Sequence, residues 1–188
     1  MRIIAGKYRG KKLITPKSAN IRPTEDRVRE AIFSILYSLL GTLTEKNILD
    51  VFAGTGAFGL EALSRGAKNV CFIDKDIETL SKNTYLFEKE KDALQILRTD
   101  ILNLPYAPKA FDIVFSDAPY DKGLNEKALD NLQKKGFLKN GTICIIETRK
   151  TEDLYLPENF QLSDERVYGM AKIRFYTYSS NFVTKQLQ

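Results

Sequence analysis

The chain has 188 residues, 43% of them apolar, and a formal net charge of +5, values that suit one α/β domain and exclude a second full domain. No apolar run approaches membrane-spanning length, and the start is charged where a signal peptide would be apolar, which indicates a cytoplasmic protein without membrane contact. With no histidine, and with Cys71 and Cys144 each inside an apolar run typical of a buried strand, catalytic triads and the usual zinc sites are excluded and no metal is expected.

The positive charge is concentrated at the N-terminus. Residues 1–29 contain nine basic and two acidic side chains, a net +7, so the rest of the chain carries −2 of the total +5. Such an arm indicates a polyanionic partner, because Lys and Arg release counterions from phosphates. We predict a basic arm over residues 1–23 with a short hairpin over residues 2–14, in which Tyr8 either stacks on a base or packs on the protein body. The predicted nucleic-acid contacts are Arg2, Lys7, Tyr8, Arg9, Lys11, Lys12, Arg22, Arg27 and Arg29.

A long amphipathic helix follows the arm. Thr24 is a suitable N-cap, and acidic residues follow it in the first turn. Apolar residues then recur at helical spacing from Val28 to Leu40, and Gly41 ends the pattern. We therefore predict a helix over this stretch with one buried face.

The stretch Ile48–Gly59, ILDVFAGTGAFG, predicts a strand, a glycine loop and a helix N-terminus in succession. The spacing of Gly54, Gly56 and Gly59 matches the dinucleotide pattern, and the same loop also serves S-adenosylmethionine enzymes. A bare tight turn is the structural alternative. Glycine permits positive φ and close approach of a ligand, so a nucleotide-like cofactor is expected.

Two carboxylates follow the next two predicted strands. Asp74 ends the strand Val70–Ile73, 20 residues after Gly54, at the spacing where a carboxylate binds both ribose hydroxyls; Asp76 is a weaker candidate. Asp100 follows the strand 94–97 and is suited to receive an adenine amino group, with Ile101 against the ring. A turn or N-cap role is the alternative for Asp100.

The stretch Phe111–Tyr120, FDIVFSDAPY, predicts a buried strand whose carboxyl end carries Asp117, Ala118, Pro119 and Tyr120. Proline stops strand pairing and stiffens the loop. A carboxylate, a backbone carbonyl and an aromatic ring are thereby brought together. This group is suited to hold a planar amine, with acceptors on its hydrogens and a ring on its face.

The remaining elements complete an α/β pattern. We predict a helix over residues 122–135, a strand over 142–146 that ends at Glu147, and a closing hairpin over 166–179. Lys172 and Arg174 in that hairpin are expected to be charges at the rim rather than catalysts. Residues 181–188 are expected to form a loose tail.

The phrases MRIIAGKYRGKKL, RPTEDRVREAIFSIL, LDVFAGTGAFGLEALSRGA and DIVFSDAPYDKG resemble the bacterial 16S ribosomal RNA guanine N2-methyltransferases from residue 1 to the closing hairpin. The resemblance implies a Rossmann-like, seven-stranded S-adenosylmethionine-dependent methyltransferase fold over residues 24–180. It implies that Asp50, Gly54 and Gly56 line the methionine end of the cofactor, that Asp74 binds the ribose, and that Asp100 binds the adenine. It further implies that Asp117 to Tyr120 hold the target base.

One position departs from the family motif Asp-Pro-Pro-Tyr, because Ala118 replaces the first proline. Alanine supplies the same backbone carbonyl, so activity is expected to survive with a less rigid loop. The implied substrate is 16S ribosomal RNA, free or in a partly or fully assembled small subunit, and a monomer is expected. Alternatives are methylation of an adenine amine in DNA, a non-enzymatic RNA-binding protein and, more weakly, an NAD-dependent oxidoreductase, for which little chain remains to build a substrate domain.

Overall fold

The computed structural model describes residues 1–16, 23–120 and 122–180, so the predicted tail and Arg22 lie outside the described residues. The chain divides into two compact units, Met1–Thr99 and Asp100–Gln188. Among the helices of the described ranges, none combines the length and apolar character needed to cross a bilayer.

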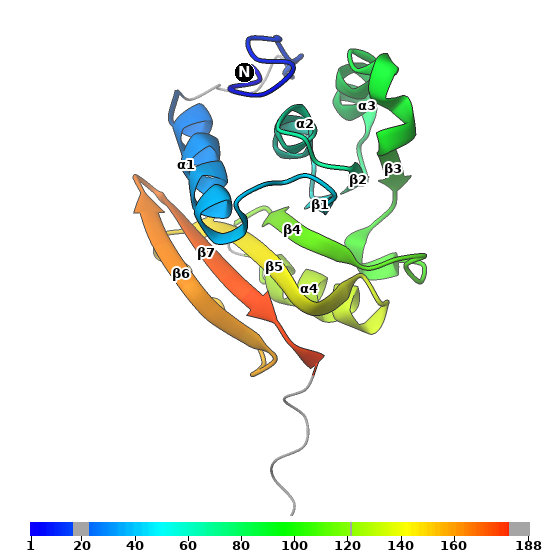
Figure 1. Ribbon diagram of the computed structural model, residues 1–188. Coiled ribbons are helices and arrows are strands. Elements are labelled where there is room, and N and C mark those ends of the chain that lie inside the picture. Colours follow the sequence, from blue (N-terminus) through cyan, green and yellow to red (C-terminus); the bar gives the residue numbers. More distant parts are fainter. Residues whose placement is uncertain (17–22, 121, 181–188) are drawn as a thin grey trace, which may run out of the picture. The chain divides into compact units, whose positions relative to one another are not determined.

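The first unit is built on three parallel strands in the order β3-β2-β1. Its elements are α1 (Pro23–Leu40), β1 (Asn47–Val51), α2 (Ala57–Ser64), β2 (Asn69–Asp74), α3 (Glu78–Tyr85), the 3-10 helix η1 (Glu88–Ala93) and β3 (Leu94–Arg98). Helix α2 packs on β1 and β2 (Figure 1). Gly59 makes this approach possible, since a Cβ there would lie 2.6 Å from Cγ1 of Val70.

Helix α1 agrees with the predicted amphipathic pattern. Its apolar face is buried, with Val28, Ile32 and Leu36 each less than a tenth exposed. The helix ends at Gly41, which adopts φ +70° and donates its N–H to the carbonyl of Tyr37 at 2.8 Å. A residue with a Cβ is strained in this left-handed conformation, so the glycine stops the helix.

The N-terminal residues form a short hairpin whose ladder is a single antiparallel bridge between Arg2 and Lys12. The Ile3 N–H donates to the Lys11 carbonyl at 2.9 Å, and the Gly10 N–H donates to the Ile3 carbonyl at 2.9 Å. Ile3 and Leu13 are buried. Within the hairpin, these two side chains supply buried apolar surface beside the few backbone hydrogen bonds.

The second unit contains four strands in the order β4-β5-β7-β6. Its elements are η2 (Ile101–Asn103), β4 (Phe111–Asp117), α4 (Leu124–Lys134), β5 (Leu138–Arg149), β6 (Phe160–Tyr168) and β7 (Ala171–Tyr178). Strands β4 and β5 are parallel, and the pairs β5–β7 and β6–β7 are antiparallel. Helix α4 packs on β5 and η2.

The closing hairpin is present as β6 and β7, but the prediction that Arg174 is a rim charge is wrong. Arg174 is 5% exposed, because β7 lies between β5 and β6 and its side chains are covered. Its guanidinium donates to Glu165 at 2.8 Å, to the Thr148 hydroxyl at 2.9 Å and to the Glu152 carbonyl at 3.0 Å. These bonds replace the water that the buried charge has lost.

Candidate functional site

The loop between β1 and α2 combines three positive φ angles within five residues. Phe52 has φ 57°, Gly54 has φ 54° and Gly56 has φ 75°. Gly56 is required by packing, because a Cβ there would lie 2.6 Å from Cδ1 of Leu80. A Cβ on Gly54 would meet only the Phe52 carbonyl oxygen, at 3.9 Å. Gly54 is therefore the glycine of this loop whose backbone faces open space.

Asp50 lies behind this loop rather than on its surface. It is 2% exposed, and its Oδ2 accepts the Gly59 N–H at 2.9 Å. The pKa of the Asp50 carboxyl is raised to about 8, chiefly by burial; the hydrogen bond from Gly59 opposes this rise, and the nearby Asp74 carboxylate adds to it. Asp50 therefore fixes the first turn of α2 against the end of β1.

The buried carboxyl of Asp50 predicts an unusual pH dependence of stability. Its pKa of about 8 lies above the ordinary value of 3.8 for an aspartate, so between these values the unfolded chain releases a proton that the folded protein retains. This contribution to the free energy of unfolding is fully present below about pH 4 and is lost as pH rises towards 8, at no more than about 1.4 kcal/mol per pH unit. As pH rises between these values, urea unfolding should show the free energy of unfolding of wild type falling relative to that of Asp50→Asn. If the free energies of both proteins changed in parallel with pH, the raised pKa of Asp50 would be contradicted.

Asp74 lies outside the glycine loop but is hydrogen-bonded to it. At the end of β2, its Oδ2 accepts the Gly54 N–H at 2.8 Å and its Oδ1 accepts the Asp76 N–H at 3.0 Å. An ionised carboxylate accepts about four hydrogen bonds, so these two do not saturate it. Asp76 instead caps the following turn by accepting the Glu78 N–H at 3.1 Å.

The N-terminal arm is anchored on α2 by a buried carboxylate that the sequence interpretation missed. Glu61 is fully buried; its Oε2 accepts the Ile4 N–H at 2.7 Å, and its Oε1 accepts the Ala5 N–H at 3.0 Å and Arg65 Nε at 2.6 Å. Ser64 adds a bond from the Tyr8 N–H at 2.9 Å. The arm is thus a docked part of the first unit.

A second buried side chain connects the arm to the glycine loop. Asn83 is fully buried, and its Oδ1 accepts the Ile14 N–H at 2.7 Å. Its Nδ2 donates to the carbonyls of Ile14 at 2.9 Å and Thr55 at 2.8 Å. One amide therefore fixes the end of the arm relative to the loop that carries Gly54.

Several predicted nucleic-acid contacts are engaged within the protein. The Tyr8 hydroxyl donates to Glu90 at 2.7 Å, and its ring meets Phe87 edge-on with 5.0 Å between centroids. Lys7 forms an ion pair with Glu90, and the Lys11 ammonium lies 4.9 Å from the Phe87 ring centroid. Of the two alternatives for Tyr8, the structure shows the one in which it packs on the protein body.

Arg29, which we predicted to contact nucleic acid, is buried. Its side chain is 7% exposed and lies 2.9 Å from Asp26 Oδ1 and 3.8 Å from Glu61 Oε2, which gives it a structural role. Four other predicted contacts are exposed, and within the described residues their side chains show no carboxylate partner: Arg2, Arg9, Lys12 and Arg27.

In the second unit, the end of β4 meets the end of β5. Asp117 is exposed and pairs in register with Glu147, because both end neighbouring parallel strands. Asn125 Nδ2 donates to the Glu147 carbonyl at 3.2 Å, and its Oδ1 accepts the buried Ser116 hydroxyl at 2.8 Å. The start of α4 is thereby tied to both strand ends, which holds the Asp117 loop between them.

Tyr120 turns back towards this strand end. Its hydroxyl donates to Glu147 Oε1 at 3.1 Å, and the Arg149 guanidinium lies 5.6 Å from its ring centroid. Burial and the carboxylates of Glu147 and Asp117 raise the pKa of Tyr120 well above its usual range. The phenol therefore stays protonated and remains a donor. Ala118 is buried, whereas Pro119 is exposed.

Asp100 caps the short helix η2, since its Oδ1 accepts the Leu102 N–H at 3.0 Å. This is the turn role that was the structural alternative for this residue. Ile101 is 3% exposed, and its carbonyl accepts Asn131 Nδ2 at 2.6 Å. Both residues are thus fixed at the start of the second unit.

We call Asp117, Ala118, Pro119 and Tyr120 the Asp117 group. Sequence interpretation missed three residues that lie around this group: Glu147, Asn125 and Arg149. One signal was available for Glu147, because it ends a predicted strand, and parallel strands place their carboxyl ends at one sheet edge. Asn125 and Arg149 had no such signal.

Comparisons with known proteins agree over almost the whole chain. The family model described as Conserved hypothetical protein 95 matches residues 1–177. Ribosomal RNA small subunit methyltransferase D from Haemophilus influenzae is 36% identical, over 94% of this chain and 93% of that protein. The protein of the same name from Escherichia coli K12 is also 36% identical, over 94% of this chain and 89% of that protein.

A solved structure gives the same answer for the fold. It is that of "Putative methyltransferase yhhF" from Escherichia coli, which superimposes with a TM-score of 0.80 at 32% identity, covering 95% of this chain and 98% of that one. The predicted Rossmann-like, seven-stranded methyltransferase fold is confirmed. The chain therefore belongs to the family described as Conserved hypothetical protein 95, and the methyltransferase resemblance predicted from its sequence is confirmed.

Proposed function

We propose that this protein transfers a methyl group from S-adenosylmethionine to the exocyclic N2 of a guanine in 16S ribosomal RNA. The observation that carries the proposal is the exposed Asp117 carboxylate, at the end of β4 in the same loop as Tyr120. The names of the two relatives support ribosomal RNA of the small subunit as the substrate. The guanine N2 is the finer part of the proposal and rests on the family resemblance.

The residues around the glycine loop suit the proposed cofactor. Gly54 offers an accessible backbone, and Asp74 beside it has unused acceptor capacity for ribose hydroxyls. Asp50 and Gly56 would support the loop at the methionine end from behind, because both are committed to contacts within the protein. In the second unit, Asp100 and Ile101 would contact the adenine. When bound, the cofactor supplies an electrophilic methyl group on a sulfonium.

The Asp117 group would act on the nucleophile. The guanine N2 is a poor nucleophile because its lone pair is delocalised into the ring, so positive charge develops on it as the N–C bond forms and the S–C bond breaks. Asp117 and the Ala118 carbonyl would accept hydrogen bonds from the amine and stabilise that charge. Asp117 is also suited to accept the proton that the nitrogen loses.

Tyr120 would hold the face of the base. Its hydroxyl is fixed by Glu147, so the ring has a defined orientation and costs little entropy to position. Pro119 would stiffen the loop in front of it. A base must be unpaired or flipped out to stack on such a ring, which favours single-stranded RNA or a loop as the substrate.

Two rival functions differ from the proposed one in substrate or in their need for a methyl donor. Methylation of an adenine amine in DNA would use the same acceptors, so only the identity of the methylated nucleic acid distinguishes this function from the proposed one. A non-enzymatic RNA-binding protein would have no need for Asp117 and a cofactor loop, and it would not bind S-adenosylmethionine.

The test is transfer of labelled methyl from S-adenosylmethionine to unmethylated 16S ribosomal RNA, free and assembled with ribosomal proteins, beside duplex DNA. We expect label in the ribosomal samples, recovered as N2-methylguanine after digestion. Label in DNA alone, or label on another base, would overturn the substrate. Binding of RNA without binding of the methyl donor would favour the non-enzymatic alternative.

A further inference from the structure

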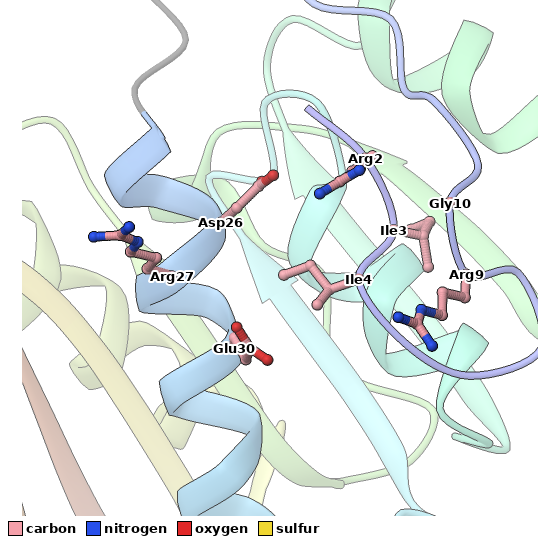
Figure 2. A pocket seen from close by; sticks show the side chains of 8 residues that line it. All are labelled: Arg2, Ile3, Ile4, Arg9, Gly10, Asp26, Arg27 and Glu30. Atoms are coloured by element: carbon pink, nitrogen blue, oxygen red, sulfur yellow. The ribbon is translucent and has the colours of Figure 1, made fainter.

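A cavity of about 430 Å³ lies between the N-terminal hairpin and the first turns of α1 (Figure 2). Both walls belong to the first unit. The volume falls within the roughly 300–1,000 Å³ that is usual for small-ligand sites. Its lining residues are Arg2, Ile3, Ile4, Arg9, Gly10, Asp26, Arg27 and Glu30.

The two walls are held together by buried groups, so the cavity is largely preformed. One Arg29 nitrogen donates to the Arg2 carbonyl at 2.7 Å and to Asp26 Oδ1 at 2.9 Å, which joins the hairpin to α1. Two residues further along the hairpin, the Ile4 N–H donates to Glu61 Oε2 at 2.7 Å. A ligand entering this space does not have to order its own site, which favours affinity.

The charged groups around the cavity are of both signs and are not paired with each other. Arg2 and Arg9 are exposed and, in the part of the chain that the structure describes, their guanidinium groups show no partner. Asp26 is committed to Arg29, whereas the Glu30 carboxylate shows no such bond within the same residues. Figure 2 shows Arg2 and Arg9 on the hairpin side and Glu30 on α1 opposite them.

This arrangement selects the chemistry of a ligand. Guanidinium groups bind phosphate, and the partly exposed Ile4 offers an apolar surface for a ring. An ionised carboxylate only accepts hydrogen bonds, so Glu30 suits a group that presents two adjacent donors. Among the bases, guanine presents N1–H and the N2 amine side by side on its Watson–Crick edge, whereas adenine and cytosine pair one donor with an acceptor.

We propose that this cavity binds one unpaired guanosine of the RNA strand, separate from the methylated base, with its base edge on Glu30 and its phosphate on Arg2 and Arg9. The proposal rests on the proposed function, because it takes RNA as the polyanion that the basic arm receives. It adds a site of sequence recognition that the Asp117 group does not supply.

The test measures binding of short uridine-only RNA oligonucleotides that carry one guanosine, inosine or adenosine at the same internal position, by fluorescence anisotropy without methyl donor. Wild type should bind the guanosine oligonucleotide roughly tenfold more tightly than the adenosine one, with inosine between them because it lacks the N2 amine. Glu30→Gln should remove this preference, because the NH₂ group of the glutamine amide would face one of the two hydrogen-bond donors of guanine. Both Glu30 and Arg9 are exposed, so their variants are expected to fold.

Arg9→Gln should weaken the binding of all three oligonucleotides by the same factor. It should also reduce the number of ions released on binding, read from the salt dependence of the affinity, by about one. Arg166→Gln, which removes an exposed charge of the same type from β6, should change neither affinity nor preference. Equal binding of all three oligonucleotides by wild type, or a guanosine preference that survives Glu30→Gln, would overturn the proposal.

Asp117→Asn separates this proposal from the proposed function. A preference lost in Asp117→Asn and kept in Glu30→Gln would assign guanosine binding to the target-base group and overturn the cavity site. A preference that depends on Glu30 in a protein that transfers no methyl group would support the cavity and count against the proposed reaction alone.

Discussion

Asp117→Ala is expected to lower kcat for methyl transfer to ribosomal RNA by about 10²–10⁴-fold while leaving the affinity for S-adenosylmethionine unchanged. The carboxylate is exposed at the end of β4, where it would accept the hydrogens of the reacting amine and stabilise its developing charge. The charge is absent from the ground state, so the loss falls on kcat rather than on KM. Single-turnover kinetics with labelled donor and isothermal titration of the donor measure the two quantities separately.

Asp130→Asn is the matched control, because it removes an exposed carboxylate from α4 whose one ion pair among the described residues is with Lys134 on the same helix. It should leave kcat within error of wild type. If Asp117→Ala retained more than a tenth of the activity, the acceptor role of this residue would be refuted. Equal losses of donor binding and turnover would instead indicate that the variant disturbs the fold.

Glu61→Ala is expected to cost about 3–5 kcal/mol in the free energy of unfolding, because it leaves buried charge and backbone donors without an acceptor. The carboxylate is fully buried and holds the N–H groups of Ile4 and Ala5 together with Arg65. The hairpin should also lose its docking on α2, so hydrogen exchange of the Ile4 and Ala5 amides should accelerate. Urea unfolding and exchange mass spectrometry measure the two effects.

Glu78→Ala provides the comparison, since Glu78 is 75% exposed and pairs with Lys82 on the same face of α3. Such an exposed pair contributes roughly 0.3–0.5 kcal/mol. A cost below about 1 kcal/mol for Glu61→Ala would show that water accepts the hydrogen bonds of the missing carboxylate with little loss of stability. The docked hairpin would then depend on its apolar contacts, chiefly Ile3 and Leu13.

Local sequence patterns predicted the features whose conformation depends on residues close together in the chain. The glycine loop, the carboxylates at strand ends and the amphipathic helix α1 follow from spacing, because positive φ, strand alternation and helical periodicity act over a few residues. The motif from Asp117 to Tyr120 follows in the same way. These features also carried the family resemblance, since it was recognised on contiguous phrases of the chain.

Other features depended on which segments meet in the fold, and here prediction from sequence failed. We predicted Arg29 to contact nucleic acid and Arg174 to be a charge at the rim, yet both are buried because other segments of their own unit cover them and supply acceptors. Strand β5 also extends from Leu138 to Arg149, well beyond the predicted residues 142–146, because pairing with β4 and β7 supports both of its ends.

The sequence by itself therefore determined the fold class and the family, and it predicted the glycine loop and the motif from Asp117 to Tyr120, because each is written in residues close together in the chain. Only the tertiary structure decided that Glu61 and Asn83 fix the hairpin, which they contact across 56 to 69 positions. It also decided that Glu147 orients Tyr120. A buried polar side chain needs a partner, but its sequence neighbourhood does not reveal which distant backbone group will provide one.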